Sequence, residues 1–331
     1  MTCPSNVSFS HFLVIPRVTV TGANAISSPI TYGFPSITNF LGMMWALQRK
    51  VSSAGLSDVT FHGVGVVCHA SRLHAARFWG GSGVGMVNTF SQTRNPLNSR
   101  GQVAPIIEEG RINLNVSFVF SVNCPRWSLA PASTVKSDLS IILHTLMTLR
   151  AASGTLDQDP SISPVQREPW LLGNTPNIES EFMETRFSLL PGFSLVSRHD
   201  ALIERLRHLR STSMVEANLM DALVSFCRHE WSYNQHAGEW ERTSPISDGW
   251  LVPMPVGYVG ISDLSGPGDI PESRDNSVPH HFVESIYSVG EWVSPHRISS
   301  PVDLIWHADR GQSGIYRCLN SYSANRIYED D

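Results

Sequence analysis

The sequence predicts an α+β fold, with strands and helices alternating in the first half of the chain and further helices in the second. Two patterns carry this prediction. One is an apolar, strand-like run that leads into an amphipathic helix, and the other is a later ten-residue run in which apolar and polar residues alternate. With 331 residues, 41% hydrophobic and 16% charged, the chain can bury a large core. We therefore expect a single elaborated domain over residues 1–331.

The first expected strand is His11–Val20, which is rich in Val and Ile. Pro16 lies inside it and lacks a backbone N–H, so the strand should lie at a sheet edge or contain a bulge there. A loop of small and polar residues then leads to a helix that begins near Pro35, a residue suited to a first helical turn. The apolar side chains of this helix recur at helical spacing, so one face should pack on a sheet. They are Ile37, Phe40, Leu41 and Met44.

Two further strands are expected at Val59–Ala70 and at Arg111–Phe120, the second of which carries the clean alternation. The stretch between them, Ser71–Glu109, is rich in Gly, Asn, Ser and Arg and has little periodicity. A loop of this length inside a compact domain is usually functional or disordered. A second helix is predicted over Ser137–Ala152, followed by a surface linker, Ser153–Pro169.

The second half predicts a strand after the Pro191–Gly192 turn and two amphipathic helices, His199–Arg210 and Met214–Glu230. A tract rich in Pro and Gly, Pro253–Pro279, then precedes a strand-like segment, Phe282–Trp292. The order of elements in the first half resembles ferredoxin-like wiring, which RNA-recognition modules share. The expected organisation is an RNA-recognition-like core over 11–150, with a long loop at about 71–109, and helical and irregular additions with returning strands over 151–331.

Basic and acidic residues are segregated along the chain. Residues 1–107 carry seven basic residues and one acidic residue, whereas the remainder carries 17 basic and 28 acidic residues. These formal charges of +6 and −11 indicate an electropositive face on an otherwise acidic body. Among the 24 basic residues only Lys50 and Lys136 are lysines. Arginine binds phosphate bidentately and stacks on bases, which suits RNA, although a codon bias toward arginine would give the same ratio.

Nothing in the sequence indicates a membrane or secreted protein. Apolar runs stay short of the roughly 18 residues of a membrane helix, and the N-terminus lacks the basic segment of a signal peptide. The five cysteines are scattered, with no CxxC pair, which favours reduced thiols over a disulfide framework or zinc site. A cytoplasmic location is expected.

The sequence offers little for catalysis. Gly80–Val87 has a G-x-G core but lacks the strand, helix and acidic residue of a dinucleotide site, so we interpret it as a hairpin tip. His69 and His74 are five residues apart and do not share a helical face, so no metal or cofactor is expected. A metal-independent ribonuclease would need only a histidine and a partner such as His296 with Tyr287, and the residues alone leave that alternative open.

Four blocks of sequence, in order from Leu13 to Ile298, together carry a resemblance. They are "LVIPRVTVTGANAISSPITYGFPSITNFLGMMWAL", "SQTRNPLNS", "EEGRINLNVSFV" and "FVESIYSVGEWVSPHRI". The chain resembles the backbone-end subunit of type I-F CRISPR surveillance (Csy) complexes, the second Csy subunit, from the family that caps the 5′ end of the guide RNA.

The resemblance implies a modified RNA-recognition (RAMP) fold with a thumb and no catalytic activity, because separate nucleases process the RNA and cleave the target. It implies a role in antiviral defence through binding of the 5′ handle of CRISPR RNA. The implied partners are CRISPR RNA, the large subunit of the complex and the backbone subunits, with target DNA reached only through the complex. No membrane partner is implied.

Carried over position by position, the matching blocks nominate RNA-binding residues in three regions. They are Asn24, Ser27 and Ser28 in the opening loop, Arg72, Arg77, Arg94, Asn95 and Arg100 in the thumb-like stretch, and Arg274, Asn276, His296 and Arg297 in the late tract.

Each nomination has an alternative. The opening-loop side chains could serve turn and capping chemistry, and the arginines could be solvated loop charges. Three aromatic residues of the thumb could stack on bases or instead contact a neighbouring subunit; they are Phe78, Trp79 and Phe90. Three apolar residues of the late segment are expected in the core, namely Ile286, Val289 and Trp292. A scaffold that contacts only protein is the remaining alternative to RNA binding, and the acidic remainder of the chain is compatible with it.

Overall fold

The computed structural model describes residues 10–81, 86–173, 177–212, 214–228, 230–243, 249–273, 275–309 and 314–323. The chain divides into two compact units. Unit 1 comprises Met1–Ser194 with Ser294–Ile305, and unit 2 comprises Leu195–Val293 with Trp306–Asp331. Each unit combines a sheet with helices, which confirms the predicted α+β class.

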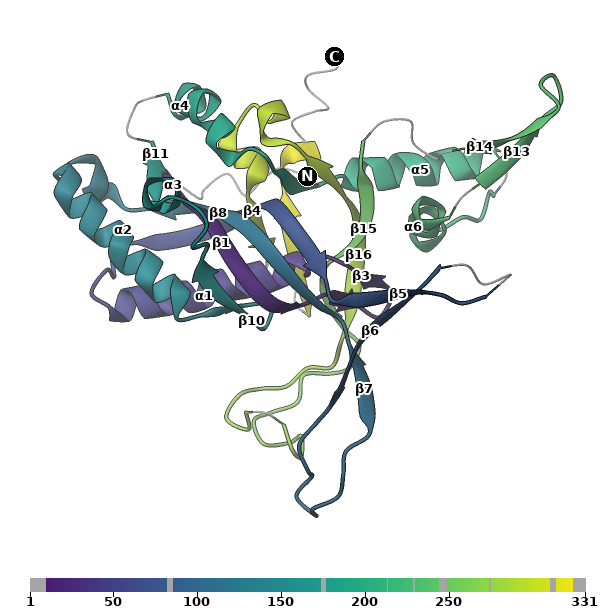
Figure 1. Ribbon diagram of the computed structural model, residues 1–331, viewed down its shortest axis with the longest axis horizontal. Coiled ribbons are helices and arrows are strands. Elements are labelled where there is room, and N and C mark those ends of the chain that lie inside the picture. The colour runs from purple at the N-terminus through teal and green to yellow at the C-terminus, as the bar shows by residue number, and fades with distance from the viewer. Residues whose placement is uncertain are drawn as a thin grey trace. The chain divides into compact units, whose positions relative to one another are not determined.

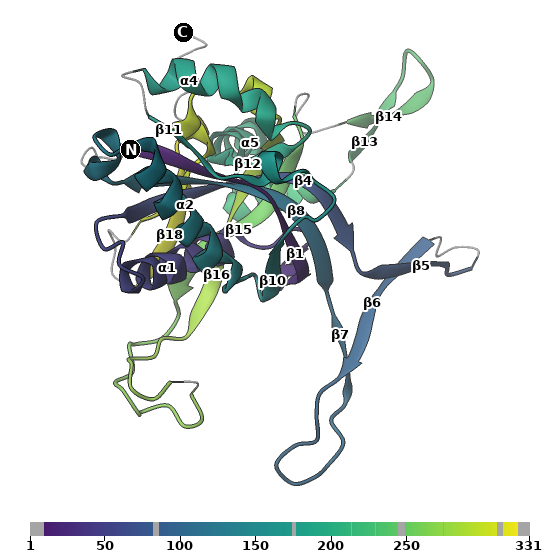
Figure 2. The same ribbon diagram turned by 60° about the vertical axis from the view of Figure 1, so that its left-hand side comes forward.

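Unit 1 is built on an antiparallel sheet and two long helices (Figures 1 and 2). In chain order these elements are β1 (His11–Asn24), α1 (Ile37–Ser53), β4 (Thr60–Leu73), β8 (Arg111–Asn123), α2 (Ala132–Met147) and β10 (Gly154–Gln158). The strand order in space is β4–β8–β1–β10, and each neighbouring pair is antiparallel. Each helix therefore joins two strands that flank a third.

The core of unit 1 lies between the sheet and the buried face of α1. The Ser36 hydroxyl caps this helix by accepting a hydrogen bond from the backbone N–H of Thr38. The four apolar residues predicted to face the sheet are fully buried, which confirms the helical periodicity. Aromatic rings continue the core across the sheet, with Phe40 6.0 Å from Phe118 and Phe118 5.9 Å from Phe120, measured between ring centroids.

Strand β1 is an inner strand, and of the two arrangements expected at Pro16, an edge or a bulge, the structure has the bulge. It pairs with β8 on one side and with β10 and β11 (Trp170–Leu172) on the other. The register with β8 shifts between Ile15 and Val18. Arg17 has a φ of 54°, and its backbone N–H donates to the Ser117 hydroxyl, 3.1 Å away. A bulge tolerates proline because no ladder hydrogen bond is required of it there.

The predicted surface linker Ser153–Pro169 was wrong. It contains β10, which extends the sheet beside β1, and the short helix α3 (Pro164–Arg167). Leu156 of β10 is only 3% exposed. One buried apolar residue between polar neighbours is too weak an alternation to signal a strand, so pairing with β1 decides its structure. Helix α2 also begins five residues earlier than predicted and ends at Met147, before the short strand β9 (Arg150–Ala151).

The stretch Ser71–Glu109, expected to be a long loop, consists largely of strands. It contains β5 (Ala75–Trp79), β6 (Met86–Arg94) and β7 (Ile106–Glu109), which form an antiparallel three-stranded sheet. Figure 2 shows these strands leading away from the main sheet of unit 1. We call residues 75–109 the projection. The glycine-rich stretch falls between β5 and β6, as expected of a hairpin tip, although residues 82–85 lie outside the described residues.

Smaller elements complete unit 1. A two-stranded hairpin in the opening loop consists of β2 (Ile26–Ser28) and β3 (Thr31–Tyr32). Helix α4 (Ile178–Thr185) follows β11, and the short helical turns η1 (Pro125–Ser128), η2 (Arg186–Leu189), η3 (Pro295–Arg297) and η4 (Pro301–Leu304) lie in connections. The strand predicted after Pro191–Gly192 is β12 (Phe193–Ser197), and its first two residues pair with β4.

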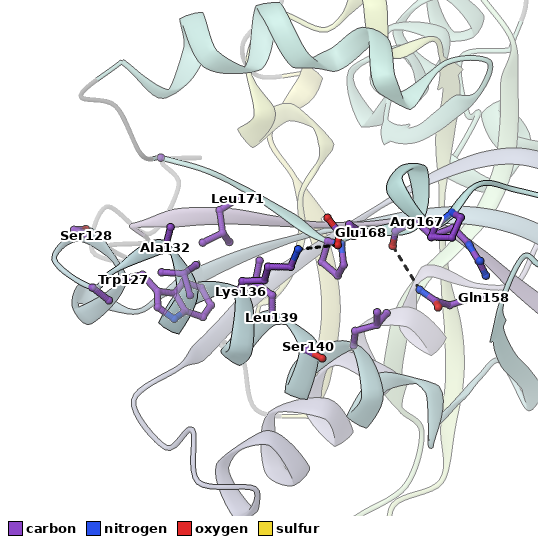
Figure 3. A pocket seen from close by; sticks show the side chains of 16 residues that line it. Trp127, Ser128, Ala132, Lys136, Leu139, Ser140, Gln158, Arg167, Glu168 and Leu171 are labelled. Carbon is purple, nitrogen blue, oxygen red and sulfur yellow. Dashed lines mark hydrogen bonds and ion pairs between the residues drawn. The ribbon is translucent and has the colours of Figure 1, made fainter.

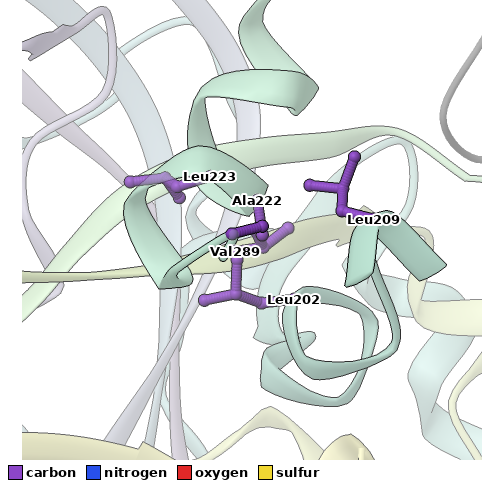
Figure 4. Close-up of a cluster of buried hydrophobic side chains, with 6 residues drawn as sticks. Leu202, Leu209, Ala222, Leu223 and Val289 are labelled. Atoms are coloured by element: carbon purple, nitrogen blue, oxygen red, sulfur yellow. The ribbon is translucent and has the colours of Figure 1, made fainter. Parts of the chain in front are cut away.

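The main strands of unit 2 pair antiparallel in the order β16–β15–β18–β17. These strands are β15 (Leu251–Gly260), β16 (Val283–Val293), β17 (Trp306–Asp309) and β18 (Ile315–Asn320). Helices α5 (His199–Thr212) and α6 (Leu219–Cys227) confirm that two amphipathic helices lie here, but the second is shorter than the predicted Met214–Glu230. Glu230 instead begins a hairpin of β13 (Glu230–Asn234) with β14 (Glu239–Thr243). The helices and β16 share a buried cluster, drawn in Figure 4, of Leu202, Leu209, Ala217, Ala222, Leu223 and Val289.

Replacing Leu156 by alanine tests the assignment of this segment to the sheet. Leu156→Ala should lower the free energy of unfolding by about 2–4 kcal/mol, because it removes a buried side chain and leaves a cavity. Urea unfolding followed by circular dichroism measures the change. Val165→Ala, on the exposed side of α3 in the same segment, is the control and should change stability by no more than about 0.5 kcal/mol. Equal losses of stability in the two variants would indicate that the segment is a surface linker after all.

Candidate nucleic-acid interface

The projection carries basic and aromatic side chains on one face. Its register pairs Ala75 with Phe90 and Arg94 with Ile106, and successive side chains of a strand point to opposite faces. One face therefore carries Arg77, Trp79, Phe90 and Arg94, with the exposed Glu108 on the same face opposite Gln92. The sequence could have suggested this, because the two arginines and two aromatics are separated by even numbers of residues within each strand.

The aromatic residues of this face differ in their surroundings. Trp79 is 66% exposed, whereas Phe90 packs edge-to-face on Tyr32 of the opening loop, with ring centroids 5.6 Å apart. An indole exposed beside guanidinium groups can stack on an unpaired base, and such stacking contributes about 1–3 kcal/mol per base. Phe90 instead helps to fix the projection against the loop. Phe78, also exposed, lies on the opposite face.

Three arginines in and beside the projection are available to a ligand. Arg72, Arg94 and Arg100 are exposed, and within the described part of the chain their side chains make no hydrogen bond or ion pair. Arg111, just beyond the projection, is by contrast paired with Glu109 at 2.9 Å. Asn95 is exposed next to Arg94. Guanidinium groups without carboxylate partners keep their full positive field and their donors for phosphate.

The opening loop uses its polar side chains internally. The Asn24 amide donates to the carbonyl of Ile26 at 2.9 Å and accepts from the N–H of the same residue at 3.0 Å. The hydroxyls of Ser27 and Ser28 lie 2.8 and 2.7 Å from that of Thr31. These three nominated residues are therefore occupied with turn chemistry, which was the alternative stated for them.

This loop also holds the base of the projection. The N–H of Ala25 donates to the carbonyl of Gly110 at 2.9 Å, where β7 passes into β8. A Cβ on Gly110 would lie 2.6 Å from Cγ1 of Ile26, so only glycine fits this approach without a shift. The loop acts on the candidate interface by positioning it.

The described late-tract residues are divided between the two units. Asn276 belongs to unit 2, where its side chain accepts a hydrogen bond from the hydroxyl of Ser273, and Arg274 lies outside the described residues. His296 and Arg297 are exposed on η3 of unit 1, and the Nδ1 atom of His296 is 2.8 Å from the Ser294 hydroxyl.

The three residues of the late segment that were expected in the core differ in how deeply they are buried. Val289 is fully buried in the cluster of unit 2, which confirms the expectation for it. Ile286 and Trp292 are half-buried, and the Trp292 ring pairs with that of Trp250, with centroids 6.1 Å apart.

His69, considered above as a metal ligand, has a structural position. Its Nδ1 atom lies 2.6 Å from the carbonyl oxygen of Pro191, and its Nε2 atom lies 2.6 Å from the hydroxyl of Ser117. Burial lowers the pKa of this imidazole to about 4, so it is neutral near pH 7. It therefore ties β4 to β8 and to the segment before β12.

The described residues hold no group of three or more His, Cys, Asp or Glu arranged to bind a metal ion. The described cysteines are all free thiols, and three of them are buried or largely buried, so that desolvation raises their pKa above the usual range. The raised values are about 11 for Cys68, about 11 for Cys124 and about 12 for Cys318. Protonated thiols are poor nucleophiles and poor ligands.

A separate groove of about 740 Å³ lies beside α2, α3 and β11 (Figure 3). Its wall is formed in part by Trp127, Leu139 and Leu171, and Lys136 pairs with Glu168 across it at 2.9 Å. Among the described residues, the cations that line it are Lys136, which is so paired, and Arg167. The groove thus lacks the open basic and aromatic character of the projection.

Comparison with known proteins identifies the class of protein to which this chain belongs. The family model of CRISPR-associated proteins described as Cas_Csy2 matches residues 13–318 of this chain. The CRISPR-associated protein Csy2 of Pseudomonas aeruginosa (strain UCBPP-PA14) is 36% identical over 319 residues, which cover 92% of this chain and 94% of that protein. The chain is thus a CRISPR-associated protein.

More specifically, the chain belongs to the Csy2 family, the second subunit of the type I-F Csy complexes. The resemblance drawn from the four sequence blocks is thereby confirmed. Within the described residues, the helices are all too short or too polar to span a membrane.

The buried His69 predicts a pH dependence of stability. Its pKa in the folded protein, about 4, is below the usual 6.5, so between these values the unfolded chain binds a proton that the folded chain does not. Stability should therefore fall as the pH drops from 6.5 to 4, by at most about 1.4 kcal/mol per pH unit from this residue, and should not depend on it above pH 7. Urea unfolding at a series of pH values measures the slope.

His69→Gln should make that slope shallower, because glutamine does not titrate. The exposed His144→Gln serves as the matched control and should leave the slope unchanged. If the slope of stability against pH is unaltered in His69→Gln, then His69 is not the cause of the pH dependence.

Proposed function

We propose that this protein is a non-catalytic RNA-binding subunit of a type I-F CRISPR RNA-guided surveillance complex, acting in antiviral defence by holding the 5′ handle of CRISPR RNA. The observation that carries the proposal is the projection, with Arg77, Trp79 and Arg94 on one exposed face. Proteins hold single-stranded RNA by combining phosphate contacts with base stacking, and this face offers both.

The primary RNA contacts proposed are Arg72, Arg77, Arg94, Asn95 and Arg100. Four arginines in and beside a short extension outnumber its two acidic residues, Glu108 and Glu109, so the local field is positive. Glu109 is moreover paired with Arg111. Asn24, Ser27 and Ser28 contribute by shaping the opening loop under Phe90. Asn276, His296, Arg297 and Arg274 are proposed as secondary contacts to RNA or to a neighbouring subunit.

The fold proposed for unit 1 is a modified ferredoxin-like or RAMP fold. Its support is the sheet order β4–β8–β1–β10, in which the pairs β1/β4 and β8/β10 are each joined by a helix across an intervening antiparallel strand. We propose further that both units belong to one elaborated domain. In support, the chain passes between the units three times, after Ser194, Val293 and Ile305.

The partners proposed are the large subunit and the backbone subunits of the complex. Exposed Phe78 and Trp79 suit burial against a protein neighbour as well as base stacking. Target DNA would be recognised by base pairing with the guide, the division of labour known in other RNA-guided systems. A cytoplasmic location follows from this role.

A binding role is favoured over the ribonuclease alternative by the surroundings of its two candidate residues. The His296 ring is hydrogen-bonded to Ser294, and Tyr287 packs against the buried cluster of unit 2. Neither arrangement presents an acid–base pair to a ribose hydroxyl.

Removing two arginines of the projection tests RNA binding. Arg94→Ala with Arg100→Ala should lower the RNA that co-purifies with the protein and its operon-encoded partners. The slope of log affinity against log salt should fall by about 1.4, since each phosphate that is no longer neutralised accounts for about 0.7. Fluorescence anisotropy with handle RNA measures affinity and slope. Arg49→Ala with Lys50→Ala, two exposed basic residues of α1, removes the same charge and is the control for net charge. An equal loss in the control would point to overall charge and not to the projection.

A cleavage assay separates binding from catalysis. The purified protein, incubated with CRISPR repeat RNA in the presence of a chelator, should leave the RNA intact on a denaturing gel. Cleavage that disappears in His296→Ala would support the ribonuclease instead.

A further inference from the structure

A second surface, in unit 2, is apolar and acidic, whereas the projection is basic. Helix α6 and the hairpin β13–β14 follow one another closely in the chain, and together they expose an unusual number of large apolar side chains. We call this the α6–hairpin surface; it consists of Leu219, Met220, Val224, Trp231, Tyr233 and Trp240. Such concentration marks interaction sites, because soluble proteins rarely leave apolar patches open to water.

Helix α6 is apolar on two sides. Ala222 and Leu223 are buried in the cluster of unit 2 (Figure 4). Met220 and Val224, one turn apart on another side, are 47% and 45% exposed. Asn218 and Asp221 form a capping box that fixes the start of the helix, so this second stripe is held in a defined orientation.

The hairpin has an aromatic face and an acidic face. Its register sets Tyr233 opposite Trp240, with ring centroids 5.5 Å apart, and Trp231 shares their face. Glu239 and Glu241 are exposed on the reverse face. Three exposed aromatic rings on a two-stranded hairpin have little within the hairpin to bury them, whereas Trp and Tyr are the residues that anchor protein interfaces.

The helix and the hairpin can serve one partner. Only residues 228 and 229 separate Cys227 at the end of α6 from Glu230 at the start of β13, so their adjoining ends are no more than about 11 Å apart. Residues 214–243 contain five acidic and two basic residues. This negative charge repels the phosphates of RNA or DNA and attracts lysine and arginine.

We propose that the α6–hairpin surface is a docking site for a protein with an apolar centre and a rim of lysine or arginine residues. The proposal rests on the proposed function in one respect, that the protein acts within a multi-subunit complex. It assigns RNA and protein to different surfaces, with RNA on the projection and the basic protein on α6 and the hairpin.

A photo-crosslinking experiment tests the proposal in the assembled complex. The full chain, with p-benzoylphenylalanine replacing Trp240, is co-expressed with the proteins and guide RNA of its locus, and the purified complex is irradiated and analysed by mass spectrometry. We expect one crosslinked peptide from another subunit, with lysine or arginine within a few residues of the link. Leu264, equally exposed in unit 2, is the matched control position and should not crosslink to that peptide.

Every other result would overturn the proposal. A crosslink to RNA, to a second copy of this chain or to a peptide without basic residues, or no crosslink, would each assign a different role or none. In the expected case, Glu239→Lys with Glu241→Lys, on the reverse face of the hairpin, should weaken the crosslinked contact severalfold at low salt through the local field, and less at high salt. The RNA content should not fall, and Glu284→Lys on exposed β16 should not weaken the contact.

Failure of this inference is distinguishable from failure of the proposed function. Arg94→Ala with Arg100→Ala should lose RNA and keep the crosslink at position 240. A complex that keeps its RNA in both sets of variants would contradict the RNA-binding role without contradicting the docking surface.

Discussion

The antiparallel ladder between β4 and β8 is the constraint on which the rest of unit 1 depends. It runs from the pair Thr60–Asn123 to the pair Leu73–Ile112, next to which the projection begins and ends. Its inner end is fixed by buried rings, such as Phe61 and Phe120, whose centroids are 5.4 Å apart. Because the projection begins two residues after β4 ends and ends two residues before β8 begins, its direction is set by this ladder.

Polar residues near the candidate interface serve mainly to fix backbone geometry. The side chains of the opening loop close its hairpin, and its backbone holds Gly110 at the base of the projection. His69 and Arg17 likewise fix the backbone near the β1 bulge. The Arg17 guanidinium donates a hydrogen bond to the carbonyl of Leu190 at 2.6 Å, and His69 is hydrogen-bonded to Ser117. A buried polar group that has found partners inside the protein has little left for a ligand, which is why exposure and lack of an internal partner identify the candidate contacts better than residue type does.

The two units present surfaces of opposite character. In unit 1, Arg94 and Arg100 of the projection stand without carboxylate partners among the described residues, whereas Arg126 is neutralised by Asp58 at 2.7 Å. In unit 2 the exposed aromatic rings share their hairpin with glutamates. A chain with net charge −5 can thus offer a basic surface to a polyanion and an acidic one to a basic protein, because fields of exposed groups fall off within about 8–10 Å at physiological salt.

The sequence by itself determined the strongly periodic elements and the family. The helix after the opening loop, the alternating strand β8 and the helices of unit 2 follow from local spacing of apolar residues, which the finished fold does not override. Four ordered blocks carried the family, and charge segregation along the chain pointed to a basic N-terminal region. The even spacing of Arg77, Trp79, Phe90 and Arg94 was readable too, but only once strands were assumed there.

Only the tertiary structure decided the remainder. Residues 153–169 and 71–109 have weak alternation, and they become strands because an antiparallel neighbour satisfies their backbone groups, a partner that local sequence does not specify. The same holds for the site. Asn24 and Arg94 are both polar residues, and the sequence nominated both of them as RNA-binding residues. Folding satisfies the first within its own hairpin and leaves the second facing solvent, because hydrogen-bond partners are assigned by distance in space and not by distance along the chain.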